Sequence, residues 1–208
     1  MKKFELNVGI CAIIGISLKL LRMPGGNIVL LVTLGTLALF YYGLSFAFFN
    51  KIELKNIFKK ESYKTTNTNK IIGAIGLGWA LSAIIIGILH KLLFLAGTNL
   101  ILLIGLIALG IILFISIIFY FRNKAAYYKR IFKRIAIYGG IGLMAYITPS
   151  STLVDIYYRN DPAYAEIYKK VLASPDDVEL RKQLELMRIG LWNPEQDENQ
   201  IDELDNGD

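Results

Sequence analysis

Apolar stretches long enough to form membrane helices alternate with short polar segments along the first 150 residues of this 208-residue chain. About 20 consecutive apolar residues, folded as a helix, cross a hydrocarbon core of about 30 Å. Two pairs of such stretches are each joined by a short turn, and a fifth stretch follows a basic segment. The pattern predicts an all-α integral membrane protein with spans at residues 6–21, 28–49, 71–95, 100–121 and from 135 onwards.

The two paired stretches repeat each other at an offset of 72 residues. Between residues 14–34 and 86–106, 11 of 21 positions are identical, more than two unrelated apolar helices would share. Glycine and proline punctuate helices, and glycine accepts the positive φ of a tight turn. Each copy is therefore predicted to be a helix, a turn at 23–27 or 96–99, and a second helix. The polar and turn identities are Lys19, Gly25 and Asn27 in the first copy, and Lys91, Gly97 and Asn99 in the second.

The C-terminal quarter has the pattern of a short soluble tail. Asp161-Pro162 and Ser174-Pro175 each place a capping side chain before a proline, which is typical of a helix start. The second of these helices would carry an apolar stripe at Leu180, Leu184, Met187 and Leu191. Seven acidic residues without a lysine or arginine follow from Glu195, which indicates a disordered end.

These patterns divide the chain into seven expected segments. They are hairpin repeat 1 (1–50), a basic cytoplasmic loop (51–70), hairpin repeat 2 (71–121), a second basic cytoplasmic loop (122–134), a fifth transmembrane helix (135–158), a helical soluble segment (159–194) and an acidic disordered tail (195–208).

Composition and charge agree with a membrane location. The chain is 54% hydrophobic with a mean hydropathy of +0.46. Its net charge of +6 conceals a split: residues 1–154 hold 17 Lys/Arg and three Asp/Glu, whereas residues 155–208 hold six and 14. Because the basic residues flank the spans, they act as topology signals and no nucleic-acid partner is expected.

The positive-inside rule places the N-terminus and both basic loops in the cytoplasm. Five spans would put the C-terminus in the periplasm, and four would keep it in the cytoplasm. The first apolar stretch is expected to stay as an uncleaved helix, since no small-x-small cleavage site follows it. The single cysteine, Cys11, excludes an internal disulfide.

Lys19 and Lys91 are the candidate functional residues. An ionisable side chain within a membrane helix is costly and is a functional candidate by default. No Asp or Glu falls within the apolar runs 6–21, 28–49, 71–95, 100–121 and 135–154, so neither lysine has a carboxylate partner there. Two interpretations stay open. The lysines lie about one turn from a helix end, where their stems can snorkel to the interface, or they form a subunit contact or part of an ion path.

Ala74, Gly78 and Ser82 form a stripe of small residues on the third helix, where another helix is expected to pack closely. His90 is the only histidine, and no spacing of His, Cys, Asp or Glu indicates a metal site. No phosphate-binding loop, nucleophile elbow or acid–base pair is present. The sequence therefore predicts no catalytic residue, no cofactor and no metal.

A family resemblance rests on the hairpin residues. They are 13–21 (IIGISLKLL), Pro24-Gly25-Gly26 and 34–39 (LGTLAL) in the first copy, and 85–91 (IIGILHK) with Gly97 in the second. This pattern resembles the membrane hairpin of gliding-motility protein GldL, an inner-membrane motor subunit of the type IX secretion and gliding apparatus in Bacteroidota. The resemblance implies that Lys19 and Lys91 correspond to the family's helix lysine. It places Leu37 and Leu109 where the family has a membrane glutamate implicated in proton-driven motion.

The sequence thus favours a non-enzymatic, multi-pass inner-membrane scaffold or accessory subunit of an envelope complex. Its partners would be the lipid bilayer and other envelope or membrane proteins bound through the C-terminal tail, and a homo-oligomer stays open. A small transporter or channel built from two parallel hairpin repeats is the alternative, although polar residues at mid-membrane depth are scarce. A membrane enzyme is the third class, and no catalytic pair supports it.

Overall fold

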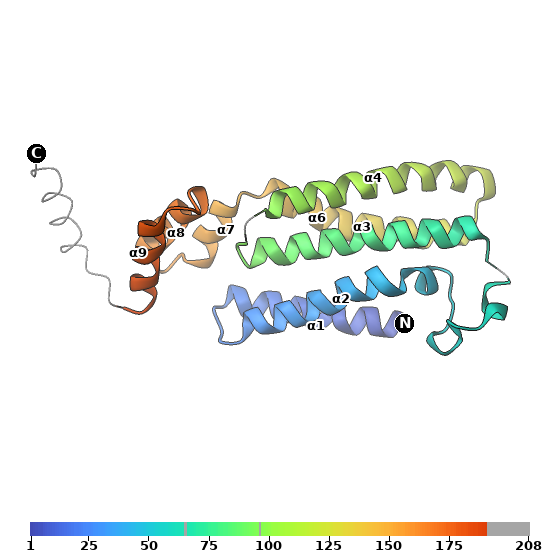
Figure 1. Cartoon of the computed structure of the whole chain (residues 1–208), viewed down its shortest axis with the longest axis horizontal. Coiled ribbons are helices and arrows are strands. Elements are labelled where there is room, and N and C mark those ends of the chain that lie inside the picture. The colour runs from blue at the N-terminus through green and yellow to red at the C-terminus, as the bar shows by residue number, and fades with distance from the viewer. Residues whose placement is uncertain (65, 96, 191–208) are drawn as a thin grey trace, which may run out of the picture. The chain divides into compact units, whose positions relative to one another are not determined.

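The computed structural model describes residues 1–190 except 65 and 96, and this part of the chain is helical, without a strand. Four long helices pair as two hairpins (Figure 1). Their bounds are α1 Lys2–Leu20, α2 Gly26–Phe49, α3 Thr68–Leu92 and α4 Thr98–Asn123. Two short 3-10 helices, η1 Leu54–Asn56 and η2 Lys60–Tyr63, lie between the hairpins. A fifth helical run joins α5 Ala126–Arg134, the π-helical segment η3 Ile135–Gly139 and α6 Gly140–Ile147.

The chain forms two compact units, Met1–Ser150 and Ser151–Asp208. The second unit holds α7 Ser150–Tyr157, which starts at the boundary, with α8 Pro162–Ala173 and α9 Val178–Arg188. Three helices, α2, α3 and α4, are long and apolar enough to cross a membrane. A fourth span arises if the run Ala126–Ile147 and α7 are counted together. Helix α1 is not among these candidates, and its 19 residues include Lys2, Lys3, Glu5 and Lys19.

Helix α3 is the centre of the first unit, because it packs against α2, α4 and α6. Its residues Leu77, Leu81, Ile84 and Ile85 are at most 1% exposed. Helix α4 lies at the periphery and presents large apolar side chains outward, among them Phe114. A helix that is apolar on all sides and buried on only one is typical of a membrane helix with a lipid-facing surface.

The residues expected to form the second basic loop are helical instead. Tyr127, Ile131 and Ile135 lie four residues apart and are all buried, so α5 has one apolar face packed on the bundle. The dense charge of this segment suggested a loop, but Lys129 and Lys133 point to the exposed side, whereas Arg130 and Arg134 bind Phe49 and Glu5 inside the bundle. The fifth helical run therefore begins at Ala126, nine residues before the expected start, and breaks at Thr148-Pro149.

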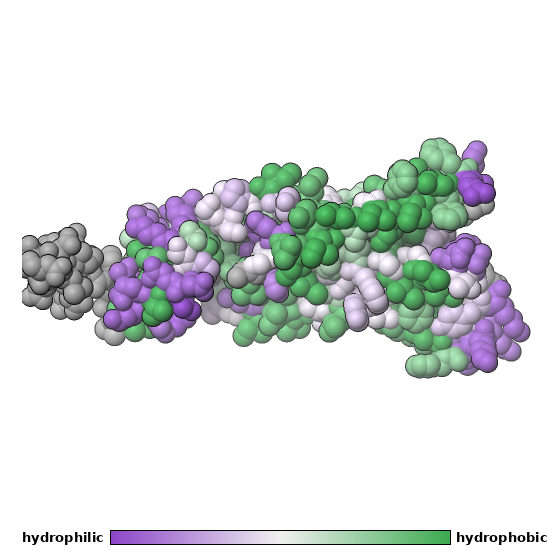
Figure 2. Space-filling model, turned by 45° about the horizontal axis from the view of Figure 1, so that its top comes forward, coloured by the Kyte–Doolittle hydropathy of each residue, from purple (hydrophilic) through white to green (hydrophobic). Residues whose placement is uncertain are grey.

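The basic residues of the first unit gather at one end of the helices. Arg134 binds Glu5 at the start of α1, Arg130 binds the carbonyl of Phe49 at the end of α2, and Tyr127 binds the carbonyl of Lys70 at the start of α3. The segments 1–5, 50–70 and 122–134 hold 14 of the 17 Lys/Arg of residues 1–154. Apolar side chains cover the helices and hydrophilic ones cover this end (Figure 2).

The second unit contains both helices expected in the tail. Asp161 caps α8 by accepting a hydrogen bond from the amide of Tyr164, as its Asp-Pro start predicted. Helix α9 begins three residues later than expected, because Asp177 rather than Ser174 supplies the cap. Tyr158 stacks against the rings of Tyr164 and Tyr168 at centroid distances of 4.6 and 5.5 Å. Leu191 of the expected stripe and the acidic tail at 195–208 lie outside the described residues.

Candidate functional site

The two hairpins have the same turn geometry. Helices α1 and α3 each end in a Schellman motif, in which the chain folds back through a left-handed residue. That residue is Arg22 in the first hairpin and Phe94 in the second, both with φ of 56°. The closing hydrogen bonds run from Met23 to Leu18 (3.0 Å) and from Leu95 to His90 (2.9 Å). The next helix starts after a left-handed glycine in both cases, Gly25 (φ 81°) and Gly97 (φ 74°).

This turn brings each repeat lysine onto the repeat asparagine. The Lys19 ammonium donates to Oδ1 of Asn27 at 2.8 Å, and the Lys91 ammonium donates to Oδ1 of Asn99 at 3.0 Å. Both lysines are buried, at 6% and 2% exposure. In both hairpins the ammonium therefore binds the first turn of the following helix. We call each of these pairs a lysine–asparagine clasp.

Two further interactions stabilise the lysine charges of the clasps. Each lysine lies in the last turn of its helix, where the negative end of the helix dipole stabilises a cation. The Lys19 ammonium also lies 5.2 Å from the ring centroid of Phe94, within range of a cation–π interaction. The clasp of the first hairpin therefore contacts Phe94 in the turn of the second hairpin. This contact joins the two turns at this end of the unit.

Replacing Asn99 by alanine is expected to lower the free energy of unfolding by about 1.5 kcal/mol. Hydrogen bonds to charged groups contribute about 1.5–3 kcal/mol, and the asparagine is exposed, so water replaces part of the contact. The measurement is a double-mutant cycle of Lys91→Met and Asn99→Ala, read by denaturant titration in detergent micelles. Additive effects of the two substitutions would contradict a direct clasp, and Lys19→Met with Asn27→Ala provides the matched pair in the other hairpin.

A buried ion pair lies at the opposite end of α1. Arg134 binds Glu5 through two nitrogens, with Nε at 3.0 Å from Oε1 and Nη2 at 2.6 Å from Oε2. Their side chains are only 12% and 15% exposed. A two-point contact between guanidinium and carboxylate is among the strongest hydrogen-bonded pairs in proteins. We call Glu5, Arg134 and their aromatic neighbours the Glu5 site.

Aromatic side chains enclose the Glu5 site. The hydroxyl of Tyr41, which is fully buried, donates to Glu5 Oε1. The ring of Tyr138 packs edge-on against Tyr41 at 5.4 Å between centroids. The Arg134 guanidinium lies 4.5 Å from the ring centroid of Phe48. Glu5 and Arg134 are thus held by α1, α2 and the fifth helical run, which fastens these three elements together.

The Glu5 site was not predicted from the sequence, because the first helix was expected to start at residue 6. Helix α1 begins at Lys2 and includes Glu5, so the expectation that no acidic residue falls within an apolar helix is corrected. A signal was present: Glu5 is the only acidic residue among the first 52. A lone carboxylate one turn into a basic helix start is a candidate for a buried ion pair.

The small-residue stripe lies in the interface between α2 and α3. Ala74 and Ser82 are buried, at 0% and 4% exposure. A Cβ added at Gly78 would come within 2.2 Å of the Ser45 side chain and 2.4 Å of the Tyr41 carbonyl oxygen. Gly78 therefore permits a helix crossing that no other residue would allow, directly beside the tyrosine that binds Glu5.

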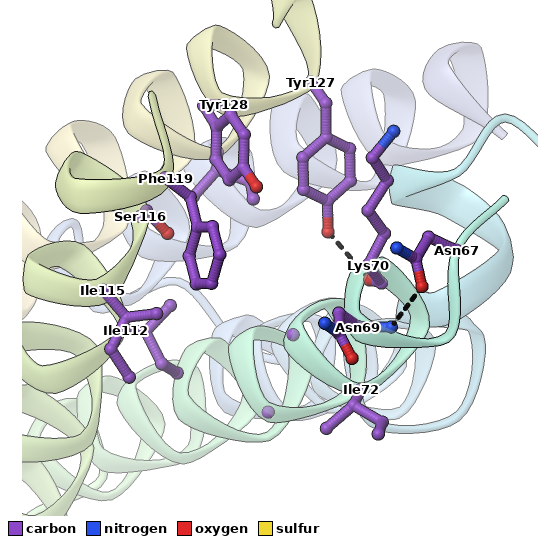
Figure 3. A pocket seen from close by; sticks show the side chains of 13 residues that line it. Asn67, Asn69, Lys70, Ile72, Ile112, Ile115, Ser116, Phe119, Tyr127 and Tyr128 are labelled. Atoms are coloured by element: carbon purple, nitrogen blue, oxygen red, sulfur yellow. Dashed lines mark hydrogen bonds between the residues drawn. The ribbon is translucent and has the colours of Figure 1, made fainter. Parts of the chain in front are cut away.

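A pocket of about 310 Å³ opens between α3, α4 and α5 at the basic end. The Tyr127 hydroxyl donates to the Lys70 carbonyl at 2.9 Å, and the rings of Phe119 and Tyr128 stack on the other side (Figure 3). The lining is mainly apolar, with the amides of Asn67 and Asn69 at one side.

Within the described part of the chain, no group of three or more His, Cys, Asp or Glu residues comes together as a metal site would require.

Comparison with known protein families, curated proteins and solved structures gives no match to this chain.

Proposed function

We propose that this protein is a non-enzymatic, multi-pass scaffold or accessory subunit of an envelope complex in a bacterial inner membrane. One observation carries the proposal: the buried charges of the described part of the first unit bind inside the bundle. Lys19 and Lys91 bind asparagines, and Glu5 and Arg134 bind each other. A transporter or an enzyme needs charged groups that face a substrate, whereas these groups connect helices.

The resemblance to GldL belongs to the same proposal. The lysine that the resemblance assigns to each hairpin takes part in a clasp, which suits a static role. Leu37 and Leu109, at the positions of the family glutamate, are buried apolar residues at 2% and 3% exposure. They pack the core and cannot exchange a proton. We therefore propose a GldL-like scaffold from duplicated hairpins that is not itself a proton-driven motor.

The proposed orientation has the N-terminus and the basic end in the cytoplasm, following the positive-inside rule. Three apolar helices, the run Ala126–Ile147 with α7, and α1 would supply five spans and place the rest of the second unit, from α8 onwards, in the periplasm. The second unit has partly exposed apolar residues on α9, Leu180, Leu184 and Met187, beside many charges. Such an amphipathic helix suits a protein partner.

Deleting residues 159–208, which leaves α7 whole, is expected to abolish copurification of envelope proteins. The measurement compares tagged full-length and truncated protein after cross-linking in native membranes, with the bound proteins quantified by mass spectrometry. Deletion of 195–208 alone is the matched control that separates the helical segment from the acidic end. Equal recovery of partners by the long truncation, at equal abundance in the membrane fraction, would reject the role assigned to the tail.

A further inference from the structure

A groove of about 650 Å³ in the first unit is basic at one end and lined by apolar side chains along the rest of its length. It lies between α1 and the fifth helical run. Leu6, Ile10 and Ile13 of α1 form one wall, and Ile137 and Ile141 form the other. All five are exposed at 46% or more, so the groove is open along its length. The fifth helical run is π-helical at Ile135–Gly139, where it borders the groove.

Three exposed lysines line the basic end: Lys2 on α1, and Lys129 and Lys133 on α5. Lys129 and Lys133 are four residues apart and share a helix face. None of the three has an ion-pair partner among the described residues. The one carboxylate that lines the groove, Glu5, is already bound by Arg134 and Tyr41. The basic end therefore carries uncompensated positive charge that an anion would neutralise.

The dimensions suit a lipid chain. From Lys2 to Ile16, the last α1 residue in the groove, the rise is roughly 21 Å at about 1.5 Å per residue. One leaflet of a hydrocarbon core is about 15 Å deep. An acyl chain that starts at the lysines therefore stays within the groove across its leaflet. Basic pockets between membrane helices on the cytoplasmic side are suited to anionic headgroups.

We infer that this groove binds an anionic phospholipid, with the phosphate at Lys2, Lys129 and Lys133 and an acyl chain along the apolar walls. The inference rests on the membrane location in the proposed function and adds a ligand to it. Bound in this way, the lipid fills the space between α1 and the fifth helical run beside the Glu5 site. A zwitterionic phospholipid would pack against the walls equally well, but its headgroup cation cancels the phosphate charge, so the net charge of the lysines would stay uncompensated.

Native mass spectrometry of the purified full-length protein tests this, with phosphatidylglycerol and phosphatidylcholine of identical chains as probes. Phosphatidylglycerol is expected to be retained about tenfold or more over phosphatidylcholine, given the attraction of several lysines. Replacing Lys2, Lys129 and Lys133 by glutamine should abolish the preference. The matched control replaces Lys55, Lys59 and Lys60 by glutamine. These lysines are exposed, and their replacement removes the same amount of charge outside the groove.

A second variant tests the apolar length of the groove. Gly9 lines the groove, and a Cβ added there meets nothing within 4 Å, so Gly9→Trp fills the space without a clash at its base. It should reduce retention of both lipids. Gly110→Trp on exposed α4, where an added Cβ is equally free, should leave retention unchanged.

Equal retention of the two lipids, or a glutamine triple variant that keeps the preference, would overturn the inference. A dimer that Gly9→Trp dissociates, with no lipid bound, would instead assign the groove to a second copy of the chain and also overturn it. Membrane fractionation distinguishes failure of the lipid-binding inference from failure of the proposed function. Protein that leaves the membrane fraction contradicts both, whereas membrane-bound protein without lipid preference contradicts only this inference.

Discussion

Arg134→Met is expected to lower the free energy of unfolding by about 3–5 kcal/mol, the usual effect of removing one partner of a buried ion pair. Glu5 would lose its charged partner in a site that is only 15% exposed. The guanidinium would also lose its contact with the Phe48 ring. Arg134→Lys should have an intermediate effect, because an ammonium keeps the charge but loses the two-point contact with the carboxylate.

The measurement is denaturant titration of the purified protein in micelles, followed by helical circular dichroism. The double variant Glu5→Gln/Arg134→Met should recover part of the loss, since no charge is then left unpaired in the site. Arg122→Met, at an exposed arginine on α4, is the matched control. If Arg134→Met costs no more than Arg122→Met, the Glu5 site does not stabilise the fold.

Gly78→Leu is expected to cost about 3 kcal/mol or more, at the upper end of overpacking effects in protein cores. The Cβ alone would overlap the Ser45 side chain and the Tyr41 carbonyl oxygen, and a backbone oxygen in a helix cannot rotate away. Helices α2 and α3 would have to separate along their interface. Because Tyr41 binds Glu5, the separation should also weaken the Glu5 site.

The same titration measures this effect, and Gly73→Ala on the same helix is its control. An added Cβ at Gly73 meets nothing within 4 Å, so alanine there should raise stability by about 0.5–1 kcal/mol through helix propensity alone. Gly78→Ala/Ser45→Gly should be milder than Gly78→Ala, since it removes one of the two overlaps. Comparable stabilities of Gly78→Leu and the wild type would show that α2 and α3 do not cross at this glycine.

The helical hairpins could be predicted from the sequence because their signals are local. Apolar runs set the helices, and Gly25 and Gly97 mark the turns within a few residues of where the next helix begins. Asn27 and Asn99 stood out in the sequence only because they are identical between the two copies, and their role could not be predicted from that. Their pairing with a lysine eight residues earlier depends on the left-handed turn at Arg22 or Phe94, a conformation that neither residue type predicts.

The Glu5 site could not be predicted, because its residues come from three distant parts of the chain. Nothing in the spacing of Glu5, Tyr41 and Arg134 reveals that α1, α2 and the fifth helical run meet at one end. The charge of the 122–134 segment also pointed away from a packed helix, since six basic residues outweighed the apolar period of Tyr127, Ile131 and Ile135. A high density of basic residues therefore does not exclude a packed helix.

The distance between Glu5 and Arg134 along the chain also affects how the protein is made. The two residues are 129 positions apart, so the ribosome adds 129 residues after Glu5 before its partner exists. At about 5–20 residues per second, this delay is roughly 6–26 s. Throughout that time the carboxylate must stay in water or pair with another cation, because burying an unpaired charge has a large free-energy cost. The beginning of α1 is therefore among the last parts of the first unit to reach its final environment, although it is the first to be synthesised.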